Sequence, residues 1–412
     1  MAEDVPRVVI VGSGFAGLTA LNRLAKSGLH VTLVDRNSYS TFQPLLYQVA
    51  TAGLTSADVA YPTWTAAHKT RTEFRKGEVT GIDTDARHVL LSDGAVLNYD
   101  YLVLATGVSA AFFGVEGAEE HSFSLYTRRD AVRLRNRLMA ELEKRSVPGN
   151  DSDLGITIVG GGATGLEMAG TLAELRNVAL PASFPAIDRA RFRVTLIEMG
   201  QSLIAPFSPH LRDYAKHELI KRGVDVRLDT KIEQVDARSV RLSDGTTLTS
   251  DMTIWAAGIS GPEWLSKLGL PMGRGARVMT GPDLRVSGHE RIFAAGDIGV
   301  IDGEPLPQLA QPAIQQGRHV ADQIRRIEAG MPTQSFKYKD KGNMATIGRR
   351  SAVVDLPIHI RVRGTLAWFA WLGLHLFYLL GGRNRLSAMV NLSWRYLTWS
   401  RGGGVIVGDD VS

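Results

Sequence analysis

Cysteine is absent from all 412 residues of the chain. Its absence excludes disulfide scaffolds, thiolate-ligated zinc or iron–sulfur sites, and enzymes that pass electrons through a thiol pair. Before residue 360 there is also no apolar run long enough to span a bilayer. The first residues do not read as a secretory signal, because Glu3 and Asp4 stand where such a signal is positively charged. The 44% hydrophobic and 22% charged residues are typical of a globular protein.

Acidic residues are missing from one long stretch, between Leu356 and Gly408, which contains six arginines. The 47 basic and 42 acidic residues give a formal charge of +5, and without these six arginines the balance would be −1. The basic surplus therefore belongs to the C-terminal tail. Because the arginines are interleaved with Trp and Leu, they do not indicate a nucleic-acid-binding face.

Two segments share one pattern, in which a β-branched strand, a glycine turn, an Ala/Leu-rich helix and a second strand lead to an acid. The first segment runs from Arg7 to Asp35 and the second from Gly155 to Glu198. Each is followed by a Ser-Asp-Gly turn and then by an apolar strand that ends in small residues. This order predicts an α/β fold in which one whole nucleotide-binding domain is duplicated.

Both glycine turns have the spacing Gly-x-Gly-x-x-Gly. The first glycine makes a tight turn, the second lets a pyrophosphate approach, the third lets the helix pack on the strand, and the acid binds a ribose hydroxyl. Asp35 follows its turn by 18 residues, but Glu198 follows by 33, and we interpret residues 177–193 as an inserted loop. Met199 after Glu198 favours NAD(H) over NADP(H), because no arginine is there to pair with a 2′-phosphate. A turn that binds no ligand is the alternative for each motif.

With these motifs the chain resembles the two-dinucleotide-binding-domain flavoproteins, and among them the single-subunit type II NADH dehydrogenases. The segment Ile292–Asp297 also belongs to the superfamily pattern, whereas Phe42–Ala50 and Ala310–Gly317 are more specific to the type II enzymes. Disulfide reductases and sulfide:quinone oxidoreductases need cysteines, which this chain lacks. The resemblance covers nearly the whole chain. It implies FAD and NADH as cofactors, a membrane quinone as electron acceptor, no nucleic-acid partner and a homodimer.

The resemblance also implies a division into domains. Residues 1–115 and 280–335 would form a discontinuous Rossmann-like FAD-binding domain. Residues 116–279 would form a Rossmann-like NADH-binding domain, which includes an inter-domain helix near residues 127–145. Residues 336–412 would form short antiparallel strands and then amphipathic helices that anchor the protein to a membrane.

Cofactor-binding residues follow from the same resemblance, and no metal site is expected. For FAD they are Gly12, Gly14, Phe15, Ala16, Gly17, Asp35, Arg36, Thr106, Gly107, Gly296, Asp297, Ala310 and Gln311. For NADH they are Gly160, Gly162, Ala163, Thr164, Gly165, Glu198, Ala257 and Gly258.

Three residues are candidates for catalysis: Glu167, Gln315 and Gln316. Glu167 lies just after the second glycine turn, where a bound pyrophosphate would repel its carboxylate, so its side chain should turn away. The resemblance gives it a proton-handling or nicotinamide-orienting role, although a carboxylate near a helix N-terminus is also stabilised by the helix dipole. The resemblance places the quinone ring near Gln315 and Gln316. A further reason for this role is that an amide can both donate to a quinone carbonyl and accept from a quinol hydroxyl. A polar helix end facing water is the alternative.

The tail contains two apolar segments, Thr365–Leu380 and Leu386–Trp399. As a helix the first would reach about 24 Å, which is short of the ~30 Å hydrocarbon core of a bilayer. Arginines and tryptophans around apolar faces are typical of interfacial helices on an anionic membrane, here at the cytoplasmic face. A buried dimer contact and a true membrane span remain alternatives. His375 reads as a buried histidine, with a proton donor at the quinone site as the minor interpretation.

Two other functions stay open. In one, the chain is a redox sensor similar to apoptosis-inducing factor, in which NADH binding changes the conformation and turnover is incidental. In the other, it is a ferredoxin-reductase-like flavoenzyme, which is disfavoured because such an enzyme needs no apolar tail.

Overall fold

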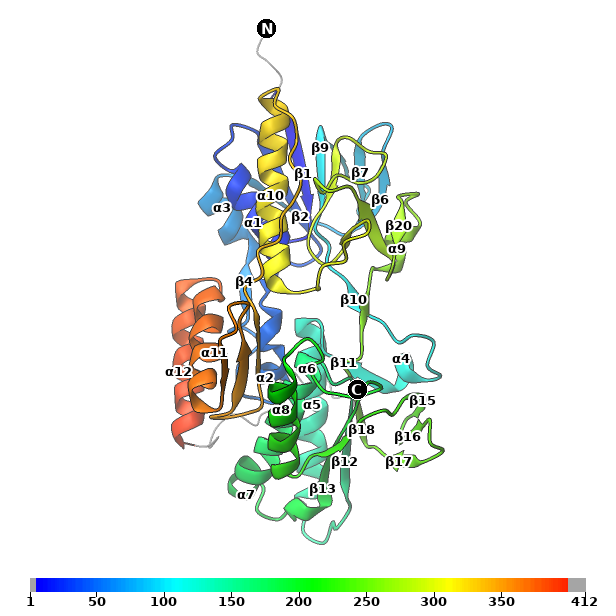
Figure 1. The fold of residues 1–412 in the computed structure, drawn as a ribbon, viewed down its shortest axis with the longest axis vertical. Helices are drawn as coiled ribbons and strands as arrows, with labels where there is room; N and C mark the ends of the chain where they lie inside the picture. Colours follow the sequence, from blue (N-terminus) through cyan, green and yellow to red (C-terminus); the bar gives the residue numbers. More distant parts are fainter. Residues whose placement is uncertain (1–4, 399–412) are drawn as a thin grey trace. The chain divides into compact units, whose positions relative to one another are not determined.

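The computed structural model describes residues 5–398, with the backbone alone for residues 395–398. The chain forms two compact units, each assembled from three separate stretches (Figure 1). Unit 1 takes its described residues from 1–40, 61–109 and 259–340, and unit 2 takes its own from 41–60, 110–258 and 341–412.

Unit 1 is built on a five-stranded parallel sheet with the order β22-β9-β1-β2-β5. Its central strand β1 is almost wholly apolar, as expected for a parallel strand with both faces covered. The helix α1 packs against α3 and α10. The bounds are β1 (Arg7–Val11), α1 (Phe15–Leu24), β2 (His30–Asp35), α3 (Thr63–Thr70), β5 (Glu73–Lys76), β9 (Tyr101–Leu104), β22 (Ile292–Ala294) and α10 (Ala310–Glu328).

Unit 2 repeats this plan in the parallel sheet β11-β18-β12-β13-β14. Its central strand β12 is fully buried, and the helix α6 packs on β12 and β13. The predicted α/β fold with two Rossmann-like domains is therefore confirmed. The bounds are β11 (Ser122–Ser124), α5 (Arg128–Arg145), β12 (Leu154–Val159), α6 (Ala163–Glu174), β13 (Phe192–Ile197), α8 (Pro209–Lys221), β14 (Asp225–Arg227) and β18 (Met252–Trp255).

Each unit also carries a three-stranded antiparallel sheet, and the two Ser-Asp-Gly sequences form hairpin turns within them. Gly94 and Gly245 end these turns with the same φ of +83°, a left-handed conformation that glycine adopts without strain. In unit 1 the strands are β6 (Val79–Asp83), β7 (His88–Leu91) and β8 (Val96–Asn98). In unit 2 they are β15 (Ile232–Asp236), β16 (Ser239–Leu242) and β17 (Thr247–Thr249).

The remaining short elements connect these sheets. Unit 1 contains α9 (Glu263–Ser266), β20 (Met272–Gly273), β21 (Arg277–Thr280) and β23 (Gly299–Ile301). Unit 2 contains the 3-10 turn Gln43–Leu45, α2 (Leu46–Ala50) and α4 (Ala118–His121). Four short strands lie where the chain passes from one unit to the other: β3 (Tyr39–Thr41), β4 (Ala60–Pro62), β10 (Ser109–Ala110) and β19 (Ile259–Ser260).

The predicted loop over residues 177–193 is in fact partly helical. After α6 the chain continues through a π-helical turn, Leu175–Ala179, into α7 (Leu180–Ser183), and a 3-10 turn, Arg189–Arg191, precedes β13. Pro181 does not break this path, because it stands in the first turn of α7, where its missing N–H is not needed. The interpretation as a loop was therefore wrong for residues 177–183, where helical structure continues from α6, and for the turn at residues 189–191.

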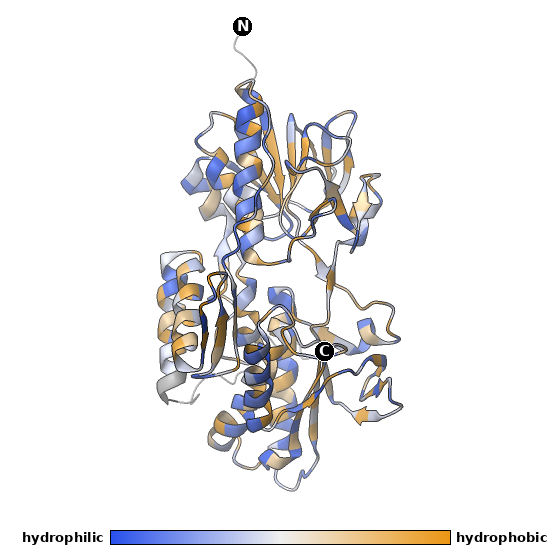
Figure 2. Cartoon of the chain, viewed as in Figure 1, coloured by the Kyte–Doolittle hydropathy of each residue, from blue (hydrophilic) through white to orange (hydrophobic). Residues whose placement is uncertain are grey.

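The C-terminal part of unit 2 starts with the predicted antiparallel strands, β24 (Asn343–Thr346), β25 (Ala352–Asp355) and β26 (Arg361–Arg363). The helices α11 (Thr365–Tyr378) and α12 (Gly382–Thr398) follow. On α11, Trp368 and Trp371 are buried, whereas Leu366, Phe369 and Phe377 are 60–75% exposed. Hydrophobic positions, coloured orange in Figure 2, occur along both α11 and α12. Among the described residues, no helix has the length and hydrophobicity needed to cross a membrane. Trp399 and Arg401, which the sequence analysis assigned to the tail, lie outside the described residues.

A buried carboxylate holds α12 to the rest of unit 2. Asp58 is 4% exposed, and its Oδ2 accepts hydrogen bonds from the Thr55 backbone N–H (2.8 Å) and from Asn391 Nδ2 (2.9 Å). The Ser387 hydroxyl donates to the other carboxylate oxygen at 2.5 Å. Nearby, Asn384 Nδ2 donates to the carbonyl of Ala60 (2.8 Å). The tail helix is therefore fixed by polar contacts, while its apolar residues Leu386, Met389, Val390 and Trp394 stay exposed.

Candidate functional site

The first glycine turn joins β1 to α1 in unit 1. Gly12 has a φ of +106°, and a Cβ at this position would collide with the carbonyl of Ala105 at the end of the neighbouring strand β9. A Cβ on Gly17 would collide with the carbonyl of Gly12. Gly14, the N-cap of α1, differs, because no atom lies within 4 Å of a Cβ built on it. Two glycines thus serve the packing of the turn, and the third leaves open space at an uncapped helix N-terminus.

The second turn, between β12 and α6 in unit 2, has the same geometry. Gly160 repeats the φ of +106°, and its Cβ would meet the carbonyl of Ala256 at the end of β18. A Cβ on Gly165 would collide with Gly160, and Gly162 again has open space around it. The N-caps of α1 and α6 are glycines that give no side-chain cap, and the N-terminus of a helix attracts an anion. Both turns fit the pyrophosphate of a dinucleotide.

An acid follows each turn and bonds to it in the same way. Asp35 Oδ2 accepts hydrogen bonds from the backbone N–H and the hydroxyl of Ser13, both at 2.7 Å. Glu198 Oε2 accepts from the backbone N–H of Gly161 at 2.6 Å, and its Oε1 accepts from Gly200 at 2.7 Å. Each carboxylate is thereby held beside the second residue of its glycine turn, where a ribose hydroxyl can reach it. The extra residues before β13 leave this arrangement unchanged.

The other predicted FAD residues of unit 1 surround α1. Gly296 has a φ of +78°, and its N–H donates to Gln316 Oε1 at 2.7 Å. The carbonyl of Asp297 accepts from Arg277 Nε at 2.7 Å. Further along α10, a Cβ on Gly317 would collide with the backbone of Ala16. Gln316, Gly317 and Arg277 therefore fix the loop that carries Asp297 and the first turns of α1 and α10.

Gln315 bonds in both directions to the backbone of Lys339. Its Nε2 donates to the carbonyl of Lys339 (2.9 Å), and its Oε1 accepts from the Lys339 N–H (3.0 Å). Gln311 is half-buried in the first turn of the same helix. The structure thus gives Gln315 a structural contact, and its predicted role toward quinone stays a prediction.

Glu167 is buried in unit 2, on the second turn of α6. Its Oε1 accepts a hydrogen bond from the Thr346 N–H in β24 at 3.3 Å. The Trp371 indole favours the ionised form of Glu167 and so lowers its pKa. The indole N–H nevertheless makes no hydrogen bond of ordinary geometry. Burial outweighs both contacts and raises the pKa of Glu167 to about 8. Glu167 is therefore largely protonated at neutral pH and able to release a proton.

His375 lies one turn beyond Trp371 on α11. Its ring stacks on the Trp371 indole at 4.1 Å between centroids, and its Nδ1–H donates to the Trp371 carbonyl at 2.7 Å. The ring of Phe42 meets it edge-on at 6.3 Å. Burial lowers the pKa of His375 to about 4, so the imidazole is neutral at pH 7. Its proton-donor role at quinone remains untested.

Comparison with known proteins places the chain in a family. Residues 6–317 match the family model for pyridine nucleotide-disulphide oxidoreductases, and residues 341–399 match the NDH2 C-terminal domain. The type II NADH:quinone oxidoreductase Ndh of Mycobacterium tuberculosis is 34% identical over 415 residues, which span 96% of this chain and 89% of that protein. This chain belongs to the type II NADH:quinone oxidoreductases.

Other members of the type II NADH:quinone oxidoreductases agree with this assignment. The enzyme of Staphylococcus aureus strain MSSA476 is 31% identical over 380 residues, which span 87% of this chain and 92% of that one. The structure of NDH2 from Plasmodium falciparum in complex with NADH has a TM-score of 0.90 and 20% identity, and covers 98% of this chain and 100% of its own. The matched fold includes the C-terminal part.

The structure gathers the predicted FAD residues in unit 1 and the predicted NADH residues in unit 2. Thr106 and Gly107 follow β9, and Ala257 and Gly258 follow β18, so both pairs end the strand beside a glycine turn. Arg36, Phe15, Ala163 and Thr164 lie in or beside the same turns.

Sequence reasoning missed the partners of Glu167 and the anchor of Asp297. Thr346, Trp371 and Arg277 carried no motif of their own. The position of Trp371, four residues before the lone histidine of an apolar helix, was the one available signal, because residues four apart share a helix face.

Proposed function

We propose that this chain oxidises NADH and reduces a membrane quinone, with FAD bound at the turn of unit 1 and NADH at the turn of unit 2. FAD, when bound, supplies a ring that accepts a hydride from NADH and passes two electrons to quinone. The supporting observation is the pair of open glycine turns at Gly14 and Gly162, each beside its own acid. In this proposal residues 1–115 with 280–335 serve FAD, residues 116–279 serve NADH, and residues 336–412 serve the membrane.

The binding residues act before any electron moves. The first-turn N–H groups of α1 and α6 bind the two pyrophosphates, and Asp35 and Glu198 bind the adenosine riboses. Met199 is 69% exposed next to Glu198, so a 2′-phosphate would face a carboxylate with no cation at the next position. Glu198 therefore selects NADH over NADPH.

Glu167 would take part in proton delivery. Reduction of a quinone to a quinol consumes two protons, and a group whose pKa lies near the working pH is well suited to deliver one. The buried carboxyl of Glu167 meets this condition. Gln315 and Gln316 are proposed neighbours of the quinone, and the hydrogen bond from Gly296 to Gln316 gives the latter a positioning role as well.

The helices α11 and α12 would bind the membrane surface at the cytoplasmic face. Their exposed apolar residues include Leu366, Phe369 and Phe377 on α11, with Met389 and Trp394 on α12. Exposed apolar groups of this size, with arginines among them, suit the boundary between headgroups and acyl chains. A homodimer remains a second proposed use of part of this surface.

The direct test follows NADH and flavin absorbance together after addition of a quinone to protein reconstituted with lipid. Rapid bleaching of the flavin by NADH and rapid reoxidation by the quinone are expected. A long-lived reduced complex would instead indicate an NADH sensor. Protein that binds FAD but never consumes NADH in the presence of quinone would refute the proposal.

A further inference from the structure

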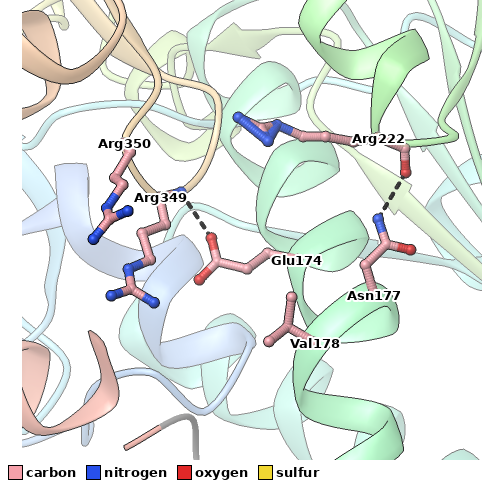
Figure 3. A pocket seen from close by; sticks show the side chains of 6 residues that line it. All are labelled: Glu174, Asn177, Val178, Arg222, Arg349 and Arg350. Carbon is pink, nitrogen blue, oxygen red and sulfur yellow. Dashed lines mark hydrogen bonds between the residues drawn. The ribbon is translucent and has the colours of Figure 1, made fainter. Parts of the chain in front are cut away.

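A cavity of about 270 Å³ lies in unit 2 at the far end of α6 from the NADH turn. Figure 3 shows the six side chains that line it, which are Glu174, Asn177, Val178, Arg222, Arg349 and Arg350. Because an α-helix rises about 1.5 Å per residue, Glu174 lies roughly 16 Å along α6 from its first residue, Ala163. The cavity is thus separate from the NADH turn, and no step of the proposed reaction uses it.

The insertion after α6 builds one wall of this cavity. In the π-helical turn, Arg176 donates to the carbonyls of Gly223 (3.0 Å) and Arg222 at the end of α8. Asn177 Nδ2 donates to the same Arg222 carbonyl at 2.9 Å. These bonds hold the backbone of Arg222 in place. Turns of the π type inside helices are frequent at functional sites.

Two polar atoms of the lining residues are buried and have no partner. Glu174 Oε2 accepts from the Arg349 N–H at 2.8 Å, but its Oε1 accepts no hydrogen bond. The Nε–H of Arg222 is also unpartnered, although its Nη2 pairs with Glu218 at 3.0 Å. Buried polar atoms are normally hydrogen-bonded, so these two atoms are suited to contact a bound molecule. A ligand that accepts from Arg222 and donates to Glu174 would satisfy both.

The charge of the lining selects an anion. Three arginines and one glutamate line the cavity. Glu218 already pairs with Arg222, whereas no ion pair of Arg350 is found within the described residues, so Arg349 and Arg350 outweigh the single carboxylate of Glu174. The guanidinium groups of Arg349 and Arg350 lie on the same side of Glu174 in Figure 3. Arginine forks match the oxygens of phosphate. This lining therefore suits a phosphate with an ammonium group nearby, which would donate to the Glu174 carboxylate.

One lining residue, Arg350, contacts the start of the tail helix α11. The Thr365 hydroxyl at the start of α11 donates to the carbonyl of Arg350 at 3.2 Å, and the next residue, Leu366, is 75% exposed. A phosphate bound at Arg350 would thus lie near the beginning of an exposed apolar helix face.

We propose that this cavity binds a phosphate ester that also carries an ammonium group with N–H donors. The phosphate would contact Arg350 and Arg222, and the donor would contact Glu174. Phospholipid headgroups and small soluble phosphate esters share this chemistry. The site goes beyond the proposed oxidoreductase function, and only its lipid source rests on the proposed membrane association.

The first experiment measures calorimetric binding of glycerophosphoethanolamine and glycerophosphocholine to the FAD-loaded protein. The choline ester lacks the N–H donors, so the wild type should prefer the ethanolamine ester about 10-fold, as for one charge-assisted hydrogen bond. Glu174→Gln should bring the ratio of the two affinities close to one. Arg350→Gln should weaken the binding of both esters about 10-fold. Glutamine is a suitable replacement because the φ of +59° at Arg350 is equally unfavourable for both residues.

Lys221→Ala is the matched control, since it removes an exposed charge next to Arg222 that does not line the cavity. Its affinities should stay within twofold of the wild type. FAD absorbance and NADH oxidation by a soluble acceptor should be unchanged in all variants, which shows that each one folds. An absence of saturable binding by wild type, or an ester ratio that Glu174→Gln leaves unchanged, would overturn the proposal.

Vesicle sedimentation distinguishes the two sources of the ester. If the source is lipid, the wild type should bind vesicles containing phosphatidylethanolamine more tightly than pure phosphatidylcholine vesicles, and Arg350→Gln should abolish this difference. If only the soluble ester binds in an Arg350-dependent way, the ligand is a metabolite. Failure to bind any vesicle would refute the proposed membrane association and leave the cavity to be judged by the soluble esters alone.

Discussion

Replacement of Glu167 by glutamine should change how the stability of the protein depends on pH. The folded protein holds a proton on Glu167 up to a pKa of about 8, whereas an unfolded glutamate releases it near the model value of 4.5. Between these values the native state binds more protons than the unfolded state. Raising the pH therefore favours unfolding, and the stability associated with this proton is lost as the pH rises through the window.

The size of the effect follows from the proton linkage. One proton bound only by the native state changes the free energy of unfolding by about 1.4 kcal/mol per pH unit. Glu167→Gln has no proton to lose at this position. From pH 5.5 to pH 7.5 the variant should thus gain about 3 kcal/mol relative to wild type. For a domain of this size that corresponds to a rise of roughly 5–10 °C in the difference between the two Tm values.

The assay is thermal unfolding by calorimetry at half-unit pH steps, with FAD saturating in every sample. Glu119→Gln is the matched control, because this glutamate is exposed on α4, and its Tm difference from wild type gives the baseline at each pH. The quinone-dependent rate provides a second readout, and it should decline above pH 8 in the wild type as the Glu167 proton is lost. A Tm difference between Glu167→Gln and wild type that stays constant from pH 5.5 to 7.5 would refute the inference that the Glu167 carboxyl is buried and protonated.

Three further predictions concern the two turns and the tail. Gly14→Ala should leave the Tm of FAD-free protein within about 2 °C of wild type but weaken FAD binding more than 10-fold, because the new Cβ contacts nothing until the pyrophosphate binds. Gly17→Ala should instead lower the Tm by several degrees, because its Cβ collides with Gly12. Glu198→Ala should raise the KM for NADH about 10-fold with unchanged flavin content, and an unchanged KM would show that the acid is misassigned. Phe369→Asp with Phe377→Asp should lower vesicle sedimentation at least 10-fold while a soluble acceptor is still reduced, and full retention on vesicles would refute the proposed membrane face.

Much of each nucleotide-binding half could be predicted from the sequence, because its geometry depends on local rules. In unit 1 the glycine spacing, the helix that follows it and the acid 18 residues after the third glycine all lie within one βαβ unit. The longer spacing between the second glycine turn and Glu198 does not disturb the contact of this acid with its turn, because β13 still ends beside Gly161. These motifs can be recognised from the sequence because the strand before the glycines and the helix after them are part of the pattern.

The contacts that depend on distant segments could not be predicted. Thr346 approaches Glu167 from 179 positions further along the chain, and Asp58 reaches Asn391 across 333 positions. Neither pairing leaves a periodic or compositional signal. The tail was expected to act at the membrane, but truncation after Leu356 would also remove Trp371, whose indole helps to bury Glu167. Substitution of outward-facing residues such as Phe369 is therefore a cleaner test of the membrane face than deletion.

The two halves of the duplication also show which residues the fold does not require. Thr19 of α1 occupies the position that Glu167 occupies in α6, because each comes two residues after the third glycine of its turn. The Thr19 hydroxyl donates within its own helix, to the Phe15 carbonyl at 2.7 Å, so the βαβ unit forms without a carboxylate there. In the second copy a carboxyl is buried at that position under Thr346 and Trp371, although burial opposes its ionisation. A residue that raises the cost of folding and is dispensable in the sister copy is best explained by function, and its raised pKa is consistent with the proposed role in proton delivery.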